Sequence, residues 1–246
     1  MTIRIAMWSG PRNISTAMMR AWENRADSAV SDEPFYAAYL AITGIQHPMN
    51  EAVLASQPQD WAQVAEEISG PAPDGAELWF QKHMTHHMVP AIGRDWFPAH
   101  RHAFLIRDPA EVVASYAVKR ETMTPLDLGY DLQADLFDEV IRRTDVTPPV
   151  IESSDVLKNP LAALSALCAA LAVPFDDAML AWPVGRRLSD GVWAPHWYAS
   201  VEASTGFRPW APSDTVLDDA QQAVVEACRP AYERLSRFRL EVPTHE

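Results

Sequence analysis

Residues 3–16 read IRIAMWSGPRNIST, and residues 17–25 continue AMMRAWENR. The apolar run predicts a buried strand over Ile3–Ser9, Gly-Pro predicts a tight turn, and Ser15–Arg25 follows as a helix. A strand that turns straight into a helix aims free backbone N–H groups at one point, and the helix dipole adds positive charge there. Arg12 supplies a full charge. This stretch therefore predicts an anion site, unless the hydroxyls at positions 15 and 16 merely cap the helix.

The same loop excludes one familiar nucleotide site. A Walker A loop needs a second glycine followed by Lys and then Ser or Thr, and neither the glycine nor the lysine is present between Gly10 and Thr16. A magnesium-dependent NTPase therefore loses support.

Outward from this stretch, short apolar segments alternate with helical patterns. Further strands are predicted at Ser28–Ser31, Glu77–His83, His102–Asp108 and Pro149–Ser153. Helices are predicted at Phe35–Thr43, Asp60–Ser69, Met88–Asp95, Ala110–Glu121, Tyr130–Arg143, Asn159–Leu171 and Leu217–Arg237. Repeated strand–helix units imply an α/β fold: a three-layer sandwich around a central, mostly parallel five-stranded sheet.

Three stretches depart from this alternation. Gly44–Pro58 and Gly70–Gly75 are predicted to be connectors, and Pro183–Pro212 a long irregular loop, which inside a compact domain is usually functional or mobile. Pro230 is expected to kink or interrupt the last helix. Without a domain-sized change in composition, we expect one domain over residues 1–246, with the loop at 183–212 and a C-terminal helix at 217–237.

Composition limits the partners. The 246 residues carry 20 Lys+Arg against 33 Asp+Glu, a formal charge of −13, which argues against nucleic-acid and acidic-membrane partners. An anionic ligand then needs cations gathered locally. Cys168 and Cys228 suggest no disulfide or metal framework, and no apolar run is long enough for a signal peptide or a membrane span. We expect a cytoplasmic protein; a homo-oligomer is compatible with the sequence but not derivable from it.

A second anion-binding pattern lies near the middle of the chain. Arg107 falls at the carboxyl end of a predicted strand, where α/β sheets bind ligands, and Ser115 lies about two turns into the next helix. A guanidinium fork and a hydroxyl together suit a phosphate. The alternative is a local ion pair between Arg107 and Asp108.

Together these patterns resemble those of the P-loop sulfotransferases, which use 3′-phosphoadenosine-5′-phosphosulfate (PAPS). Pro11–Thr16 resembles the family's 5′-phosphosulfate loop, and Arg107 with Ser115 its 3′-phosphate motif. Glu152–Pro160 looks like the family's strand-to-helix segment, and Gly191–Tyr198 like its late Gly-x-Trp loop. Two positions depart from the pattern: Ile14 stands where the family has glycine, and Arg12 where many members have lysine.

The resemblance implies a P-loop NTPase-like sulfotransferase fold, PAPS as the donor, and no metal. It also implies that Arg186 and Arg187 lie near the 3′-phosphate. The full set of donor-binding residues that it implies is Pro11, Arg12, Asn13, Ile14, Ser15, Thr16, Arg107, Ser115, Arg186, Arg187, Gly191 and Trp193.

Arg12 and three further residues are candidates for catalysis. Arg12 is placed to neutralise the leaving phosphate. Lys82 ends an apolar strand and resembles the family lysine that reaches the transferring group; otherwise it is a strand-end lysine in contact with water. Glu33 and His83 are both candidates for the base. Cytosolic animal members use a His two residues after such a Lys, but here the two are adjacent, so their side chains point oppositely on a continuing strand. Glu33 is slightly favoured, because a partly desolvated carboxylate has the raised pKa that suits a base.

His83, His86 and His87 have helical spacing but lack a fourth ligand for zinc, so no metal is expected. They are predicted to line the acceptor side or to cap a helix. Aromatic residues of the same regions either shape an acceptor pocket or pack in the core: Trp8, Phe35, Tyr36, Trp193, Trp197 and Tyr198.

The sequence therefore favours a sulfotransferase that moves a sulfuryl group from PAPS to a hydroxyl of a small-molecule acceptor, in line and without metal. Two alternatives stay open. One is a P-loop ATP-dependent kinase, with Arg12 as phosphate clamp and Asp108 as metal ligand. The other is a catalytically inactive nucleotide-binding protein of the same fold.

Overall fold

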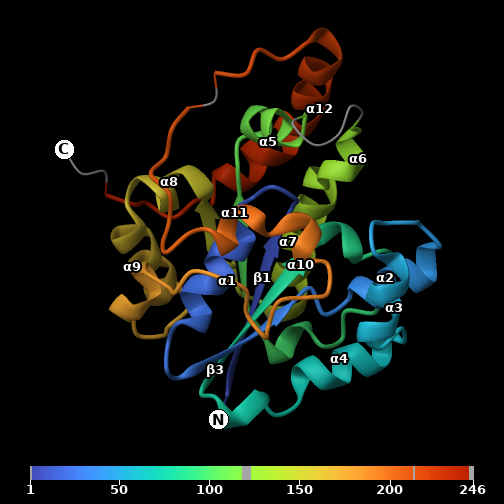
Figure 1. Cartoon of the computed structure of the whole chain (residues 1–246), viewed down its shortest axis with the longest axis vertical. Helices are drawn as coiled ribbons and strands as arrows, with labels where there is room; N and C mark the ends of the chain where they lie inside the picture. Colours follow the sequence, from blue (N-terminus) through green and yellow to red (C-terminus); the bar gives the residue numbers. More distant parts are fainter. Residues whose placement is uncertain (1, 118–122, 213, 244–246) are drawn as a thin grey trace.

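A computed structural model describes residues 2–117, 123–212 and 214–243. Its centre is a five-stranded sheet in the order β2-β3-β1-β4-β5, with every pair parallel (Figure 1). The strands are β1 (Ile3–Ser9), β2 (Ser28–Asp32), β3 (Leu78–Met84), β4 (Arg101–Ile106) and β5 (Val150–Glu152). All five lie within two residues of the predicted bounds, so the predicted α/β sandwich is confirmed.

The path of the chain through the sheet positions the site. From β1 the chain runs to β2 and β3 on one side, then passes over β1 to β4 and β5 on the other. Strand order therefore reverses about β1, and its carboxyl end is the switch point at which open α/β sheets bind ligands. Trp8 and Ser9 in β1 pair with His83 and Met84 in β3, so the two strands end level.

The sheet is buried on both faces because successive side chains of each strand point to opposite sides. Ile5 and Met7 pack in one cluster with α1, α8 and α9, whereas Ala6 and Trp8 pack in the other with α4, α5, α7 and α12. These helices are α1 (Ser15–Glu23), α4 (Trp61–Ser69), α5 (Pro109–Ala117), α7 (Tyr130–Thr144), α8 (Ser153–Lys158), α9 (Pro160–Ala170) and α12 (Asp219–Ser236). Figure 1 shows α12, in red, beside α5.

Shorter helices fill the connections. They are α2 (Tyr36–Thr43), α3 (Asn50–Ser56), α6 (Pro125–Leu128), α10 (Ala194–Trp197) and α11 (Ala199–Glu202), with single 3₁₀ turns at η1 (Pro73–Gly75), η2 (Thr85–His87), η3 (Phe97–Ala99) and η4 (Asp177–Leu180). The predicted connector at 44–58 thus contains a helix. The predicted irregular loop at 183–212 contains two short ones.

The helix predicted at Met88–Asp95 is wrong. The chain makes turns there instead, and the Arg94 guanidinium takes the carbonyls of Met88 and Val89, at 2.6 and 3.0 Å, that a helix would have used. Pro90, which has no N–H, adds to this effect.

Two other helices differ from expectation at their ends or interior. Only Pro109–Ala117 of the predicted helix 110–121 is observed, and residues 118–121 lie outside the described ranges. Pro230 does not interrupt α12, which continues through it while Cys228, Ala231 and Leu235 stay buried against the domain. Packing of this face offsets the missing hydrogen bond. None of the helices in the described ranges has both the length and the apolar character that crossing a bilayer requires.

Candidate active site

The loop between β1 and α1 adopts an unusual backbone shape. Arg12 and Ile14 have φ of 59° and 51°, both in the left-handed region. Alternation of this kind turns successive N–H groups toward one concavity that binds anions. Ile14 therefore takes the conformation that the family's glycine would adopt freely, at a cost of about 1–3 kcal/mol. Gly10 is needed for a different reason: a Cβ there would lie 2.7 Å from the Leu128 carbonyl oxygen.

The hydroxyls that follow do not cap the helix. The N-cap of α1 is Ile14, and no side chain makes a capping hydrogen bond there, so Ser15 and Thr16 enter the first turn with their hydroxyls available. Both residues line the pocket described below. The helix dipole and the uncapped N–H groups point to the same place.

Asn13 braces this loop. Its amide donates to the Leu105 carbonyl at 2.8 Å and accepts from the Ser153 hydroxyl at 2.6 Å, and it is buried. The side chain thereby ties the loop to β4 and to the start of α8. Only its backbone is left to face a ligand.

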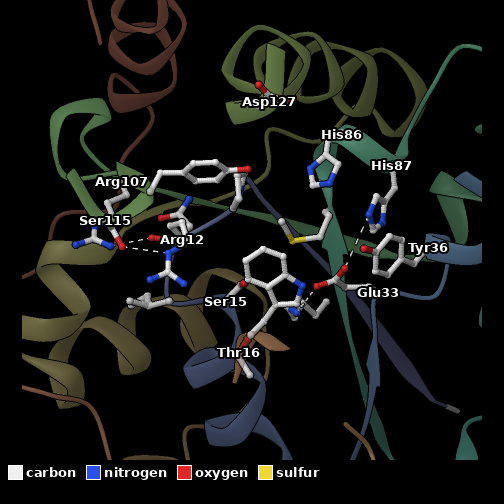
Figure 2. A pocket seen from close by; sticks show the side chains of 18 of the residues that line it. Arg12, Ser15, Thr16, Glu33, Tyr36, His86, His87, Arg107, Ser115 and Asp127 are labelled. Carbon is white, nitrogen blue, oxygen red and sulfur yellow. Dashed lines mark hydrogen bonds and ion pairs between the residues drawn. The ribbon is translucent and has the colours of Figure 1, made fainter. Parts of the chain in front are cut away.

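The two predicted arginines converge. Arg107 Nη1 donates to the Arg12 carbonyl at 2.8 Å, and Arg12 Nε donates to the Ser115 hydroxyl at 3.1 Å (Figure 2). Burial first, and then the like charge of Arg107, lower the pKa of Arg12. Arg107 also pairs with Glu111 at 2.9 Å.

The expected alternative partner, Asp108, is engaged elsewhere. It caps α5 through the N–H of Ala110 at 2.8 Å and pairs with Arg229 at 3.4 Å. The local Arg107–Asp108 ion pair is therefore not what holds Arg107.

A single cavity of about 1280 Å³ runs across the carboxyl ends of the strands. Figure 2 shows Arg12, Arg107 and Ser115 at one end and Glu33, Tyr36, His86 and His87 at the other. Its walls include Pro11 through Ala17, Lys82, Tyr39, His47, Trp193, Trp197, Tyr198 and Arg208. The cationic end and the aromatic end belong to one pocket.

At the second end lies a buried network around Lys82. Its ammonium contacts Asp32 Oδ1 at 2.8 Å, Glu33 Oε1 at 2.6 Å and the Tyr198 hydroxyl at 2.6 Å. The neighbouring carboxylates raise the pKa of Lys82 well above its usual value against the opposing effect of burial. Lys82 is thus charged and firmly held.

Glu33 has the properties of a base. It directly follows β2 with φ of 47°, a left-handed conformation that is strained for a glutamate. Burial first, and the charge of Asp32 second, raise its pKa, although Lys82 opposes the shift. Its Oε2 lies 3.9 Å from His87 Nε2 and its side chain lines the cavity.

His83 faces the other way. Because β3 continues to Met84, the imidazole of His83 lies opposite Lys82 in the core, stacked on Trp8 with ring centroids 4.7 Å apart. Burial holds its pKa well below the usual value, and it is not among the residues that line the cavity. The geometry therefore removes the basis for His83 as the base.

The remaining aromatic predictions divide between core and pocket. Trp8 and Phe35 are core residues, whereas His86, His87, Tyr36 and Trp193 line the cavity. Burial lowers the pKa of His86 to about 4, and burial also holds the pKa of His87 well below its usual value, so both imidazoles are neutral near pH 7. Among the described residues, no group of three metal-ligating side chains is gathered.

The late segment, residues 183–212, does not bring to the cavity all the residues that were expected there. Arg186 is exposed and Arg187 lies 3.8 Å from Glu23, and neither reaches the cavity; Arg208 does. Gly191 does not line it either. Its N–H donates to Asp32 at 3.0 Å, and a Cβ would lie 2.2 Å from the Trp193 ring.

Sequence reasoning missed Asp32 and Arg208 as parts of this region, and it named Tyr198 only as a pocket or core aromatic, without its contacts to Lys82 and Asp32. Asp32 and Tyr198 are 166 residues apart and meet only in the folded chain, at 2.8 Å. The one signal available for Asp32 was its position at the carboxyl end of a predicted strand, next to Glu33.

Comparison with known proteins agrees with this geometry. A family model described as a sulfotransferase domain matches residues 3–237. The chain therefore belongs to the sulfotransferase domain family.

Solved structures share the fold. The sulfotransferase from Alicyclobacillus acidocaldarius superposes with a TM-score of 0.56 at 12% identity, covering 96% of this chain and 95% of that one. The sulfotransferase domain of the Synechococcus PCC 7002 olefin synthase gives 0.52 at 16% identity, over 92% and 94%. These likenesses confirm the sulfotransferase fold expected from the sequence.

Two curated plant proteins are also similar. Branched-chain-amino-acid aminotransferase-like protein 2 of Arabidopsis thaliana is 30% identical over 229 residues, 93% of this chain and 40% of that protein. The corresponding protein 1 is 32% identical over 207 residues, 82% of this chain and 36% of that protein. The chain thus spans well under half the length of either relative. The word aminotransferase in their names describes those proteins alone.

Proposed function

We propose that the protein transfers a sulfuryl group from PAPS to a hydroxyl of a small-molecule acceptor, without a metal. The observation that carries the proposal is one cavity with a convergent arginine pair at one end and a buried Lys–Glu pair at the other. The first suits a nucleotide with two anionic groups, and the second suits the acceptance of a proton.

The donor end fits PAPS in charge and in backbone geometry. The N–H groups from Asn13 to Thr16, in the concavity that Arg12 and Ile14 create, would hold the 5′ phosphosulfate. Arg107 and Ser115 would hold the 3′-phosphate, and Arg208 is a further cation on this pocket's wall. A dianion there would relieve the repulsion that lowers the pKa of Arg12.

When bound, PAPS supplies the sulfuryl group, whose sulfur bonds to the acceptor oxygen as its bond to the bridging phosphate oxygen breaks. Glu33 is positioned to take the hydroxyl proton of the acceptor, which makes the oxygen a better nucleophile. Arg12 would neutralise the charge that develops on the departing phosphate. Lys82 now donates one N–H to Glu33 Oε1 at 2.6 Å, and it would donate this N–H to the transferring group instead.

The acceptor end favours a flat, mainly apolar acceptor body. Tyr36 and Tyr39 stack on His87 with ring centroids 4.6 and 4.9 Å apart, and the imidazoles of His86 and His87 are neutral. Rings of this kind bind by area and shape more than by charge. We propose further that residues 1–246 act as one domain, because the cavity draws on segments from Pro11 to Arg208.

The kinase alternative loses its metal ligand. It required Asp108 to face the nucleotide, but this carboxylate caps α5, pairs with Arg229 and is not among the residues that line the cavity. A catalytically inactive protein of the same fold is distinguished by assay.

The proposal is tested by incubating the protein with PAPS and EDTA against a panel of phenols, aliphatic alcohols and sugars, with products identified by mass spectrometry. We expect a sulfated product, strongest among flat apolar acceptors, together with adenosine 3′,5′-bisphosphate in equal amount. Absence of sulfation across the panel, with phosphorylation from ATP and magnesium instead, would overturn the proposal in favour of the kinase.

A further inference from the structure

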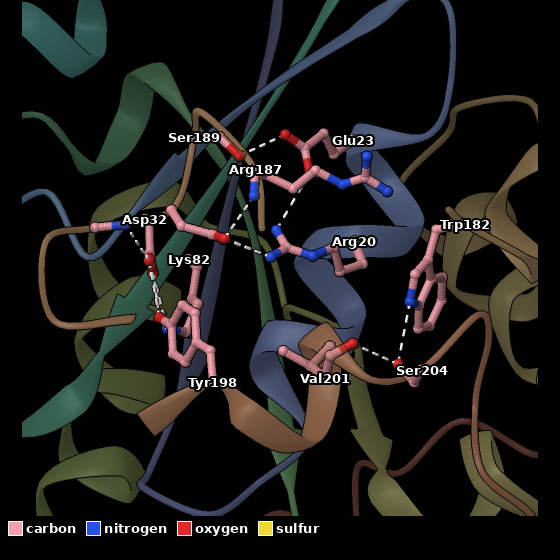
Figure 3. A network of polar contacts seen from close by, with 12 residues as sticks. Arg20, Glu23, Asp32, Lys82, Trp182, Arg187, Ser189, Tyr198, Val201 and Ser204 are labelled. Carbon is pink, nitrogen blue, oxygen red and sulfur yellow. Dashed lines mark hydrogen bonds and ion pairs between the residues drawn. The ribbon is translucent and has the colours of Figure 1, made fainter. Parts of the chain in front are cut away.

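Asp32 has no role in the proposed transfer step, although it lies next to Glu33. It ends β2, is buried, and does not line the cavity, whereas its neighbour Glu33 does. Figure 3 shows its carboxylate facing Lys82 and Tyr198. The two adjacent carboxylates therefore share one lysine, and of the two only Glu33 lines the cavity.

Three hydrogen-bond donors hold the Asp32 carboxylate. Oδ1 accepts from Lys82 at 2.8 Å, Oδ2 accepts from the Gly191 N–H at 3.0 Å, and the Tyr198 hydroxyl donates to the carboxylate at 2.8 Å. Tyr198 in turn accepts from the Trp193 indole at 3.0 Å. Apart from the half-buried Gly191, the members of this set are buried, so the Asp32 carboxylate is held from several sides and enclosed by protein.

Glu33 is the exchangeable partner of Lys82. One oxygen accepts from Lys82 at 2.6 Å, while Oε2 lies 3.9 Å from His87 Nε2, beyond a hydrogen bond. Its side chain alone of the two carboxylates faces the cavity. The charged and titratable groups that face Glu33 are Asp32 from β2, Lys82 from β3, His87 from η2 and Tyr198 from the late segment.

The buried cluster of Asp32, Glu33 and Lys82 carries unbalanced charge. Two carboxylates and one ammonium leave this buried cluster with a surplus of one negative charge, which a low-dielectric site relieves by taking up a proton. Asp32 keeps the ammonium through fixed contacts, so the surplus falls on the carboxylate that faces the cavity.

We propose that Asp32 is a positioning residue that, together with Tyr198, holds the Lys82 ammonium and so leaves Glu33 as the carboxylate that accepts the acceptor's proton. The inference rests on the proposed function, since the proton comes from the acceptor hydroxyl as its oxygen bonds to sulfur. Asp32 itself touches neither donor nor acceptor.

The test follows the protonation of Glu33 by NMR in protein labelled with ¹³C at the glutamate side-chain carboxyl, with Glu33→Gln assigning the signal. Asp32→Asn removes the like charge but keeps the shape, so the titration midpoint of Glu33 should fall. Asp32→Glu restores the charge and should bring the midpoint back toward the wild-type value. Lys82→Met removes the cation and should move it the opposite way, upward.

Glu152→Gln is the matched control, because it removes a carboxylate that is equally buried but lies outside the cavity. It should leave the Glu33 midpoint unchanged. A midpoint that stays in place in Asp32→Asn, or that falls equally in Glu152→Gln, would overturn the inference. If Asp32→Asn does not fold, failure of Asp32→Glu to keep the raised midpoint overturns it instead.

The experiment needs neither donor nor acceptor, so the two proposals fail separately. Sulfation by the wild type with no midpoint change in Asp32→Asn defeats the role of Asp32 alone. If sulfation does occur, the acid limb of its pH profile should move to lower pH in Asp32→Asn, which a merely structural role of Asp32 would not produce.

Discussion

Three residues of the site hold backbone conformations that side chains normally avoid. Arg12, Ile14 and Glu33 have φ of 59°, 51° and 47°, and each such conformation costs about 1–3 kcal/mol. The cost is sustained by the surroundings: Arg107 donates to the Arg12 carbonyl, and the Glu33 N–H donates to the Lys82 carbonyl at 2.9 Å. The strain therefore fixes where the loop N–H groups and the Glu33 carboxylate point.

At this scale the choice of base is directly testable. Glu33→Gln should lower kcat by roughly 10²–10⁴-fold, because the amide cannot take a proton, while calorimetry shows little change in affinity for adenosine 3′,5′-bisphosphate. In the wild type the rate should rise with pH through the pKa of Glu33, which burial holds above its usual value.

His83→Gln provides the contrast. The imidazole stacks on Trp8 in the core, so its loss should lower the melting temperature and leave kcat of the folded enzyme nearly unchanged. A larger loss of kcat in His83→Gln than in Glu33→Gln would reverse the assignment of the base.

Among the elements, the strands were the most predictable from sequence. Continuous apolar runs such as Ile3–Ser9 are typical of the strands of a parallel sheet, which is buried on both faces, and a Gly-Pro turn marks where the loop begins. The strand-end residues of the site followed from this, including Arg12, Arg107 and Glu33.

The rest depended on particular side-chain contacts that the apolar and turn patterns do not show. The turns at 88–95 replace a helix because the Arg94 guanidinium, within the same segment, takes the carbonyl groups of Met88 and Val89. Arg187 was expected in the pocket from its place in the late segment, but it folds back toward Glu23. Asp32 and Tyr198 belong to one network only through contacts across 166 residues.

The late segment is linked to Lys82 by a close approach that requires glycine. A Cβ on Gly191 would lie 2.2 Å from the Trp193 ring, whose indole donates to Tyr198 at 3.0 Å. Gly191→Ala should therefore displace Trp193, destabilise the fold by about 1–3 kcal/mol and lower activity in addition. Urea unfolding and the sulfation assay measure the two effects.

Gly44→Ala serves as the control for this prediction. Gly44 has φ of 67° and open space around it, so alanine costs only the left-handed conformation, about 1 kcal/mol, and leaves activity intact. Equal loss of activity in both variants would contradict the proposed link between Gly191 and Lys82.

For the whole molecule, buried histidines make stability depend on pH. His102 is neutral in the fold: Nε2 donates to the Phe97 carbonyl at 2.9 Å, and Nδ1 accepts from Trp8 at 3.0 Å. Burial lowers its pKa to about 4, and that of His100 likewise. The unfolded chain therefore binds protons first as pH falls from 6.5 toward 4, and the free energy of unfolding decreases over that range.

His102→Gln tests this linkage, because glutamine offers one donor and one acceptor without titrating. From pH 7 to 4 the wild type should lose up to about 3 kcal/mol more unfolding free energy than the variant, measured by urea unfolding at each pH. Glu152, whose burial raises its pKa to about 7, acts in the opposite direction, but it is present in both proteins and cancels. Parallel pH curves would contradict the neutral, buried state of His102.

The net charge of −13 makes the convergence of two arginines the feature that most needs explanation at this scale. Arg12 and Arg107 come from segments 95 residues apart, yet they share a hydrogen bond at the edge of one cavity. A ligand with two anionic groups accounts for this concentration of positive charge on an acidic protein.

The most direct measurement is calorimetric titration with adenosine 3′,5′-bisphosphate in EDTA, for the wild type, Arg107→Ala and the matched variant Arg186→Ala, whose exposed arginine lies outside the cavity. We predict tight, metal-free binding by the wild type and by Arg186→Ala, and a loss of about 1.5–3 kcal/mol in Arg107→Ala, the scale of a charged hydrogen bond. Equal affinity in all three proteins, or binding only of ATP with magnesium, would contradict the account.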